Sequence, residues 1–168
     1  MQFRLPEETD ETILKEYMQE HYDNGEYGIS ASMGLPTMPY SEWLLQIRMG
    51  ASEGDETWGR NLTLLCFDEA QLIGLLSIRY ELSEELSLKY GDIGYGVRPS
   101  ERNKGYATKM LRHAVSVCKD KGMKQVRLGC YKDNAASAKV VEKCGGVLVS
   151  EEEAFEPGRI CQYFMIEV

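Results

Sequence analysis

The chain has 168 residues and a formal net charge of −8, with a sequence pI of about 4.9. This length suits a single domain over residues 1–168. The acidic charge argues against a nucleic-acid partner, because phosphate contacts need clustered Lys and Arg. No apolar run approaches the roughly 20 residues that span a bilayer, and residues 1–6 lack the form of a signal peptide. We therefore expect a cytoplasmic protein with no membrane partner.

Five cysteines are scattered through the sequence without a C-x-x-C pair. An odd, dispersed set in a cytoplasmic chain is typical of buried thiols rather than of disulfides or metal ligands. Neither His21 nor His113 has a second histidine at metal-ligand spacing. We therefore expect no metal site.

The N-terminal third is expected to hold two helices joined by a long loop. Apolar residues at helical spacing predict a helix over 10–22, with Asp10 as its cap. Residues 23–39 are rich in glycine and proline and predict a loop of the length that is often functional. A second helix is expected after Ser41, and Gly50 is expected to end it.

The rest of the chain alternates strands with helices. The first two strands predict an antiparallel hairpin, and the strongest helix of the sequence follows the third strand. The order is helices first and then β-β-β-α-β-α-β-β, which implies an α+β fold with a mixed α/β sheet. The expected elements are strands 61–67, 71–80, 91–97, 124–131, 147–150 and 159–167, helices 105–121 and 134–144, and a polar stretch at 81–89.

The turn between strand 91–97 and helix 105–121 has the features of a phosphate loop. A helix N-terminus offers unpaired N–H groups and a partial positive charge to an anion. Gly105 and Ala107 are small enough for a phosphate to approach, while Arg102 and Lys104 add positive charge. The lysine precedes the glycine, which excludes a Walker loop, and Pro99 replaces the third glycine of a dinucleotide fingerprint.

The pattern Arg102-x-x-Gly105-x-Ala107 resembles the [QR]-x-x-G-x-[GA] motif of the GNAT superfamily of N-acetyltransferases. A second stretch, which opens at Asn134 and ends with Glu-Lys-Cys-Gly-Gly at 142–146, is similar to the family's N-x-x-[SA]…E-K-x-G-[FG] segment. The resemblance is firm over residues 60–168. It implies the GNAT fold, in which helices flank a central, twisted, mostly antiparallel sheet with one splayed strand pair.

The resemblance also implies acetyl-CoA as co-substrate. In the family, the pantetheine arm lies where the strand before the loop splays from its neighbour at a bulge, and the Val97 N–H would polarise the thioester carbonyl. The pyrophosphate would rest on the loop, and Lys139 or Lys143 would lie near the adenosine phosphates unless they are simply solvent-exposed. The implied cofactor-binding residues are Tyr95, Gly96, Val97, Arg102, Asn103, Lys104, Gly105, Tyr106, Ala107, Thr108, Asn134 and Ser137.

The reaction implied is attack of an amine on the thioester, which needs a base and a proton donor for the thiolate. Asp92 is the first candidate for the base and Glu81 the second, although Asp92 is also explained as a strand residue that faces water. The family often uses a tyrosine seven residues after its asparagine, and here Val141 stands at that position. Tyr131 and Tyr163 are candidate substitutes, as are water and the product ammonium.

The acceptor pocket is expected between the 23–39 loop and the 81–89 segment. Both segments carry carboxylates, and aromatic residues lie nearby, so a cationic amine would fit, although core packing also explains the aromatics. We expect an amine of a small molecule or peptide as substrate, and a homodimer as the assembly. The residues concerned are Asp23, Glu26, Glu84, Glu85, Tyr22, Tyr27, Tyr40 and Trp43.

Two alternatives to acetyl transfer remain open. One is an acyl-CoA-binding sensor without turnover, which the valine at position 141 and the absence of an evident base favour. The other is transfer of a longer acyl group, such as succinyl.

Overall fold

The computed structural model of the chain describes residues 1–154 and 156–168. Short 3₁₀ turns precede α1, α2 and α4 at Glu8–Asp10, Leu35–Thr37 and Pro99–Glu101. The helices are α1 (Glu11–Asp23), α2 (Tyr40–Ser52), α3 (Glu84–Tyr90), α4 (Tyr106–Asp120) and α5 (Ala135–Lys143). The strands are β1 (Gln2–Arg4), β2 (Asn61–Asp68), β3 (Gln71–Arg79), β4 (Ile93–Val97), β5 (Gln125–Tyr131), β6 (Val147–Glu153) and β7 (Ile160–Glu167).

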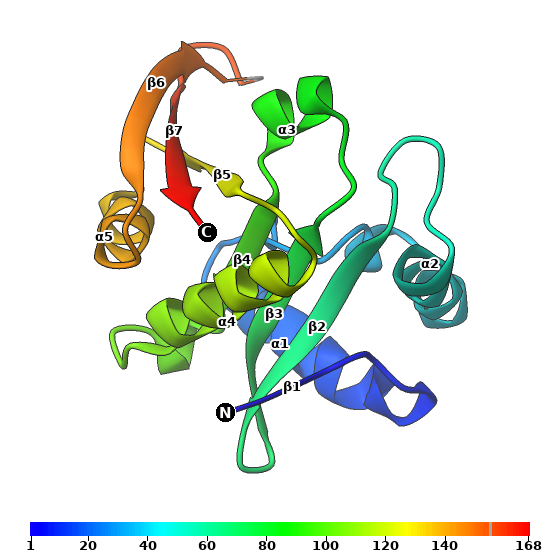
Figure 1. Cartoon of the computed structure of the whole chain (residues 1–168). Helices are drawn as coiled ribbons and strands as arrows, with labels where there is room; N and C mark the ends of the chain where they lie inside the picture. The colour runs from blue at the N-terminus through cyan, green and yellow to red at the C-terminus, as the bar shows by residue number, and fades with distance from the viewer. Residues whose placement is uncertain (155) are drawn as a thin grey trace.

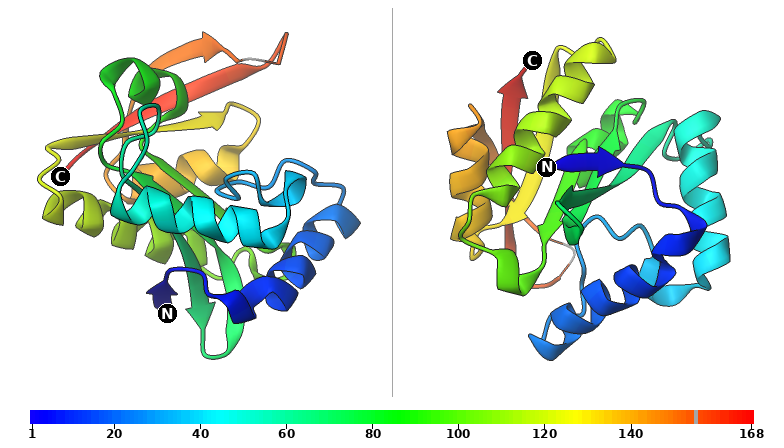
Figure 2. Two further views of the ribbon diagram at one scale, coloured as in Figure 1. Left: turned by 90° about the vertical axis from the view of Figure 1, so that its right-hand side faces the viewer. Right: turned by 90° about the horizontal axis from the view of Figure 1, so that it is seen from below.

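The strands form two antiparallel sheets, one in the order β1-β2-β3-β4 and the other in the order β5-β7-β6. Helix α4 lies on one face of the first sheet, while α1 and α2 lie on the opposite face (Figures 1 and 2). The second sheet forms a separate blade beside α5 and α3 (Figure 2). This arrangement is the α+β architecture that the order of elements predicts.

The alternation of side chains along the strands divides the core into two clusters. On the α4 side, Met110 and Leu111 are fully buried against strand residues such as Leu76. On the other side, Tyr17 of α1 and Trp43 of α2 are fully buried against the opposite face of the same sheet. Both faces of β3 are therefore covered, which fixes the position of its neighbour β4 between the two layers.

Backbone hydrogen bonds link the two sheets near the start of β4 and β5. The Asp92 N–H donates to the Arg127 carbonyl at 2.7 Å, and the Arg127 N–H donates to Asp92 Oδ2 at 2.7 Å. Beyond this junction no ladder joins β4 to β5 among the described residues, so the two strands diverge. The splayed strand pair expected from the resemblance is present. The expected bulge is not, because the β3–β4 register runs without a shift from Ile93 to Val97.

The predicted helices and the six predicted strands are confirmed, with small differences in their ends. Helix α2 continues to Ser52, so Gly50 lies inside the helix and does not end it. A larger residue at this position would be crowded, because a Cβ there would lie 3.0 Å from the side chain of Asn61. Asp10 does not cap α1 through its side chain. Its carboxylate instead accepts from Arg4 and from the Glu7 N–H at 2.7 Å, which secures the preceding turn.

Two elements were not predicted. Strand β1 is three residues long and pairs with the edge of β2, so it leaves little periodicity in the sequence. Helix α3 replaces part of the polar stretch predicted at 81–89. Ser83 caps this helix, since its Oγ accepts from the Leu86 N–H at 3.3 Å, and Glu84 favours the first turn. The Ser-Glu-Glu sequence was the available signal.

None of the described helices is long and apolar enough to cross a membrane. All five cysteines are free thiols, and Cys66 and Cys118 are buried as expected.

Candidate functional site

The free edge of β4 presents backbone donors to the gap between the two sheets. The Arg79 N–H donates to the Asp92 carbonyl, and the Arg98 N–H donates to the Ile73 carbonyl, so the even-numbered residues of β4 bond to β3. In an antiparallel ladder, successive residues direct their N–H groups to opposite sides. The N–H groups of Tyr95 and Val97 therefore face the gap, where an extended ligand can bind to them.

The loop between β4 and α4 is a second row of donors. No described residue accepts a hydrogen bond from the six consecutive N–H groups of residues 103–108. Asn103 and Gly105 have left-handed backbone angles, with φ of +62° and +82°, which turn the chain into the helix. A Cβ on Gly105 would meet nothing within 4 Å. Open space and unpaired N–H groups at a helix start are what a pyrophosphate needs.

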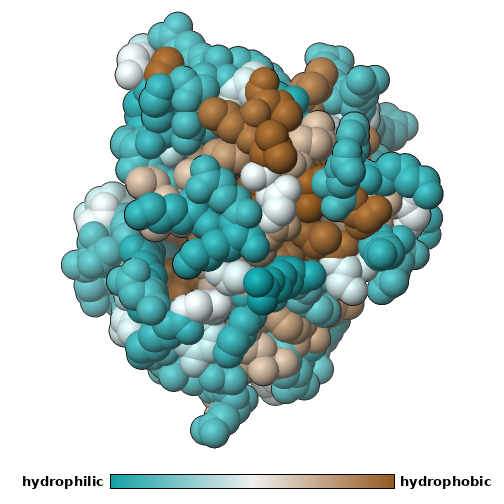
Figure 3. Space-filling view, turned by 60° about the vertical axis from the view of Figure 1, so that its left-hand side comes forward, coloured by the Kyte–Doolittle hydropathy of each residue, from teal (hydrophilic) through white to brown (hydrophobic). Residues whose placement is uncertain are grey.

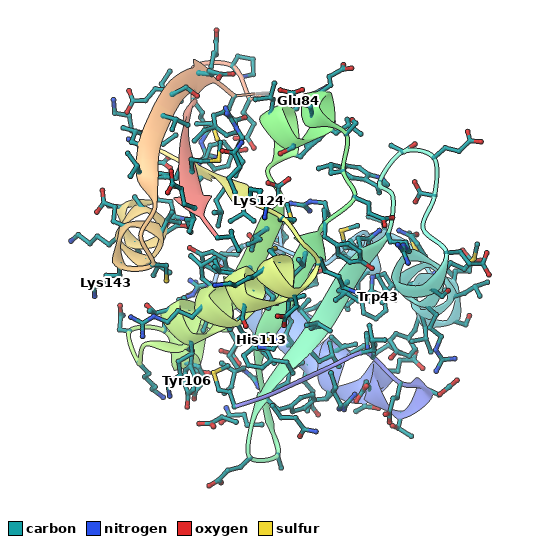
Figure 4. All side chains as sticks on the ribbon, in the orientation of Figure 1. Trp43, Glu84, Tyr106, His113, Lys124 and Lys143 are labelled. Carbon is teal, nitrogen blue, oxygen red and sulfur yellow. The ribbon has the colours of Figure 1, made fainter. Side chains whose placement is uncertain are left out.

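The second sequence landmark lies across the gap from β4. Asn134 caps α5, since its Oδ1 accepts from the Ser137 N–H at 3.1 Å. Ser137 Oγ lies 2.9 Å from the hydroxyl of Tyr95, so α5 is tied to β4. Figure 4 labels Tyr106 at the start of α4 and Lys143 at the end of α5, where the lysine points outward and is exposed. Lys139 on α5 is exposed as well. The two motifs therefore border the same gap between β4 and β5.

The side chains of Arg102 and Lys104 do not supply the free positive charge that the sequence suggested. Arg102 forms a bidentate ion pair with Glu26, at 2.5 and 2.6 Å, and its Nε donates to the Val97 carbonyl at 3.1 Å. Lys104 pairs with Glu101 at 2.9 Å. Both cations are compensated by carboxylates, so the phosphate site depends on backbone N–H groups rather than on these side chains.

Helix α1 and the residues just after it contact the loop between β4 and α4 through two glutamates. Glu20 accepts from Arg98 Nε at 2.7 Å and from the Ser100 N–H at 2.7 Å. Glu26, just beyond the helix, adds the pair with Arg102, and its carboxylate also lies 2.8 Å from His21 Nδ1. The N-terminal segment therefore supports the loop directly.

Of the two candidate bases, Asp92 lies at the closed end of the gap, where it contacts Arg127. Asp92 is buried, at 5% exposure, and its carboxylate accepts the Arg127 N–H. Glu81 is exposed and forms a bidentate pair with Arg60 that lowers the pKa of its carboxyl group. Asp92 is five residues from Val97, which corresponds to about 17 Å along a strand. The structure therefore does not bring either carboxylate next to the Val97 N–H.

The face of β4 opposite α4 is flat because two of its residues are glycines. A Cβ on Gly96 would meet the Ser30 carbonyl at 3.1 Å and the Tyr17 hydroxyl at 3.3 Å, whereas most of the space over Gly94 is open. The covering loop is strained, since Ala31 and Met33 have φ of +61° and +49°. This face of β4 is therefore open over Gly94 and covered over Gly96.

The comparisons with known proteins agree with this geometry. Residues 1–147 match the family model described as an acetyltransferase (GNAT) domain. The chain belongs to the GNAT acetyltransferase family. It is thus an acyltransferase, and the match extends the family over the first 60 residues, where the motifs gave little. No curated protein sequence matches the chain.

Solved structures of other GNAT proteins share the fold at low identity. The structure of yncA from Salmonella typhimurium with its cofactor acetyl-CoA has a TM-score of 0.69 at 16% identity and covers 99% of this chain and 92% of that one. A point mutant of spermidine N-acetyltransferase SpeG from Vibrio cholerae has a TM-score of 0.69 at 17% identity, and the match covers 99% of this chain and 95% of that one. An acetyltransferase from Salmonella typhimurium that modifies the N-terminal serine of ribosomal protein L7/L12 has a TM-score of 0.73 at 16% identity, and the match covers 99% of this chain and 94% of that one.

The two candidate proton donors of this acetyltransferase, Tyr131 and Tyr163, are engaged by other groups. Tyr131 donates to Glu156 at 3.3 Å, and Arg159 stacks 3.4 Å from its ring centre. Tyr163 donates to the Lys89 carbonyl at 3.0 Å, and burial raises its pKa to about 12. Burial also raises the pKa of Tyr131. A raised pKa makes each phenol a weaker acid toward a thiolate.

The acidic rim predicted for the acetyltransferase is smaller than the sequence suggested. Glu26 is occupied by Arg102, and Asp23 accepts from Gln19 at 2.8 Å. Of the aromatic residues named for this rim, Trp43 is buried in the core and Tyr22 and Tyr40 pack against it, as the alternative interpretation held, whereas Tyr27 is exposed. Glu84 remains exposed on α3 (Figure 4). No group of three or more His, Cys, Asp or Glu side chains that could hold a metal occurs among the described residues.

Replacing Glu26 with glutamine is expected to destabilise the acetyltransferase by about 1–2 kcal/mol at pH 7. Arg102 lowers the pKa of Glu26 from 4.5 to about 2. A lowered pKa in the folded state gives stability that is complete above pH 4.5 and is lost as the pH falls toward 2. Solvent keeps the effect modest, because the two side chains are 39% and 32% exposed.

Urea unfolding of the wild type and of Glu26→Gln at pH 7 and pH 3 measures this difference. The difference in free energy of unfolding between the wild type and Glu26→Gln should be smaller at pH 3 than at pH 7. Glu142→Gln, on the exposed surface of α5, is the control for loss of one negative charge. An equal difference in free energy of unfolding at both pH values would show that the ion pair does not cause the difference.

Proposed function

We propose that the protein transfers the acetyl group of acetyl-CoA to the amine of a small molecule or peptide. The observation that carries this proposal is the run of unpaired N–H groups at residues 103–108, next to the free edge of β4. The pyrophosphate would bind to residues 102–108, and Asn134 and Ser137 would contact the cofactor from α5. The open space beside Gly105 would accept a phosphate, and the unpaired edge of β4 would offer N–H groups to an extended pantetheine arm.

Acetyl-CoA supplies a thioester whose carbonyl carbon the acceptor amine attacks, so that a C–N bond forms and the C–S bond breaks. The Val97 N–H, or the Tyr95 N–H that points the same way, would stabilise the negative charge that develops on the carbonyl oxygen. The pantetheine arm is long, so the thioester would lie further toward the closed end of the gap than the phosphates do. This favours Tyr95, which is closer to Asp92.

Asp92 is our proposed base, and it would act through water. Tyr95 is three residues from Asp92, about 10 Å along the strand, which is too far for direct transfer to an amine at the thioester. Glu81 remains a second choice, since its pairing with Arg60 makes it a weak base. The thiolate would be protonated by Tyr131 or, more simply, by water, because both candidate tyrosines already donate to other groups.

An acyl-CoA-binding sensor without turnover is the second candidate. Val141, at the usual tyrosine position, is 1% exposed in the core and offers no proton. Release of free thiol from acetyl-CoA in the presence of a panel of amines distinguishes the two functions. We expect release that depends on the amine. Tight binding of acetyl-CoA without release for any amine would support the sensor instead.

The expected homodimer and cytoplasmic location stay as proposals. Strand β6 is an edge strand of its sheet, with Val147, Leu148 and Val149 exposed. Figure 3 shows apolar surface surrounded by polar groups on the side of the molecule that carries β6. Light scattering at several protein concentrations would measure the oligomeric state.

A further inference from the structure

Arg79 ends β3 on the face of the sheet opposite α4, and its side chain reaches over the neighbouring strand. A Cβ on Gly94 would lie 3.8 Å from Arg79 Nη2 and within 4 Å of no other described residue beyond its chain neighbours. The guanidinium group therefore borders the open space over Gly94. This is the face from which an acceptor would approach the gap between β4 and β5.

The hydrogen bonds of Arg79 all go to neutral oxygens. Its Nε donates to the Gly91 carbonyl at 3.0 Å, Nη2 donates to the Tyr90 carbonyl at 3.4 Å, and Nη1 donates to Ser77 Oγ at 3.4 Å. The two carbonyls belong to the end of α3, so part of the role of Arg79 is to hold that helix end. A guanidinium group has five N–H donors, and these three bonds leave donors for a ligand.

Among the described arginines that are not exposed, Arg79 alone has no carboxylate within 4 Å. Asp92 lies opposite it in the ladder and interacts with it at longer range, but the Asp92 carboxylate accepts the Arg127 N–H. Burial lowers the pKa of Arg79, as expected for an incompletely compensated cation. The paired arginines are Arg4 with Asp10, Arg98 with Glu20, Arg127 with Glu152, and Arg159 with Asp133.

We propose that the acceptor is an amine that also carries an anionic oxygen group, a carboxylate or a phosphate, and that Arg79 binds this group. The proposal rests on the N-acetyltransferase function proposed above. A planar guanidinium with free donors matches a carboxylate or phosphate and places it beside Gly94. The amine of the same molecule then points along β4 toward the gap. A polyamine would instead bring a second positive charge close to Arg79.

The first test compares matched acceptors with the wild-type enzyme. Thiol release from acetyl-CoA is measured with serine, with serinamide, with 2-aminoethyl phosphate and with a diamine. We expect kcat/KM to be at least about tenfold higher for serine or for the phosphate than for serinamide. The better of the two anionic acceptors identifies the group. If neither anionic acceptor has a higher kcat/KM than serinamide, or if the diamine is preferred, the proposal is overturned.

The second test changes the arginine. Arg79→Gln should abolish the preference for the anionic acceptor by raising its KM, and should leave kcat/KM for serinamide within about twofold. Arg79→Lys keeps the charge but loses the fork, so it should restore part of the preference. Arg48→Gln removes one charge from the exposed surface of α2 and is the matched control. An unchanged preference in a folded Arg79→Gln protein would exclude Arg79.

A binding measurement separates failure of this proposal from failure of the proposed function. Calorimetry of N-acetylserine and of N-acetylserinamide in the presence of CoA requires no turnover. We expect N-acetylserine to bind to the wild type and to lose at least about tenfold in affinity in Arg79→Gln. If no amine releases thiol but this pattern appears, Arg79 is an anion site and the transfer function fails. Equal affinity for acid and amide would overturn the Arg79 proposal alone.

Discussion

Replacing Gly105 with glutamate is expected to weaken acetyl-CoA binding by at least about 100-fold, or about 2.7 kcal/mol, while the protein stays folded. The new side chain would place bulk and negative charge among the unpaired N–H groups of residues 103–108. The fold should tolerate it, because a Cβ at this position meets nothing within 4 Å. A carboxylate near a helix start is also favourable in the absence of ligand. Calorimetric titration with acetyl-CoA measures the loss.

Gly122→Glu is the matched control at the other end of α4. Gly122 has the same φ of +82° as Gly105, and a Cβ there also meets nothing within 4 Å. Both variants therefore carry the same backbone strain and the same added charge, and only one lies at the loop. We expect Gly122→Glu to bind acetyl-CoA as the wild type does. Equal affinity in both variants would remove the phosphate site from this loop.

Replacing Asp92 with asparagine is expected to lower kcat by about 100-fold or more, the usual contribution of a general base. The affinity for acetyl-CoA should be unchanged in the variant, because Asp92 would act on the amine and not on the cofactor. Asparagine keeps an oxygen that accepts the Arg127 N–H, so the junction of β4 and β5 should persist. Steady-state rates give kcat, calorimetric titration gives the affinity for acetyl-CoA, and thermal unfolding gives the stability.

Asp92→Ala separates the structural role of this residue from the catalytic one. Alanine leaves the buried Arg127 N–H without its acceptor, which should cost about 1–3 kcal/mol of stability. We expect the asparagine variant to be close to the wild type in stability and the alanine variant to be clearly weaker. If the asparagine variant retains the wild-type kcat, Asp92 acts only as a link between the two strands.

The fold could be predicted largely from periodicity and from two motifs. The long amphipathic helix α4 and the hairpin of β2 and β3 have strong patterns, because α4 buries one face in one core cluster and the hairpin buries its two faces in the two clusters. Helix α3 has no buried residue, so the period of its apolar positions carried little information, and only its Ser83 cap marked it. The short strand β1 was missed because three residues are too few to show a period.

The candidate site could be inferred from the sequence where adjacent residues determine the backbone. The start of α4 needs a left-handed residue at Gly105, and a motif of adjacent residues records that need. Contacts between distant segments have no such record. The pairing of Glu26 with Arg102 joins residues 76 positions apart and changes the role of a motif arginine from phosphate binding to support. The position of Asp92 at the strand junction likewise depends on Arg127, which lies in another sheet.

The support of the loop by Glu20 and Glu26 bears on how the protein could be redesigned. These carboxylates belong to the segment that also covers the acceptor face, since Ser30 lies over Gly96 only a few residues further on. A chimera that exchanges residues 20–34 to change the acceptor would also remove the carboxylates that pair with Arg98 and Arg102. Successful grafts should therefore retain both glutamates, or replace the two arginines together with them.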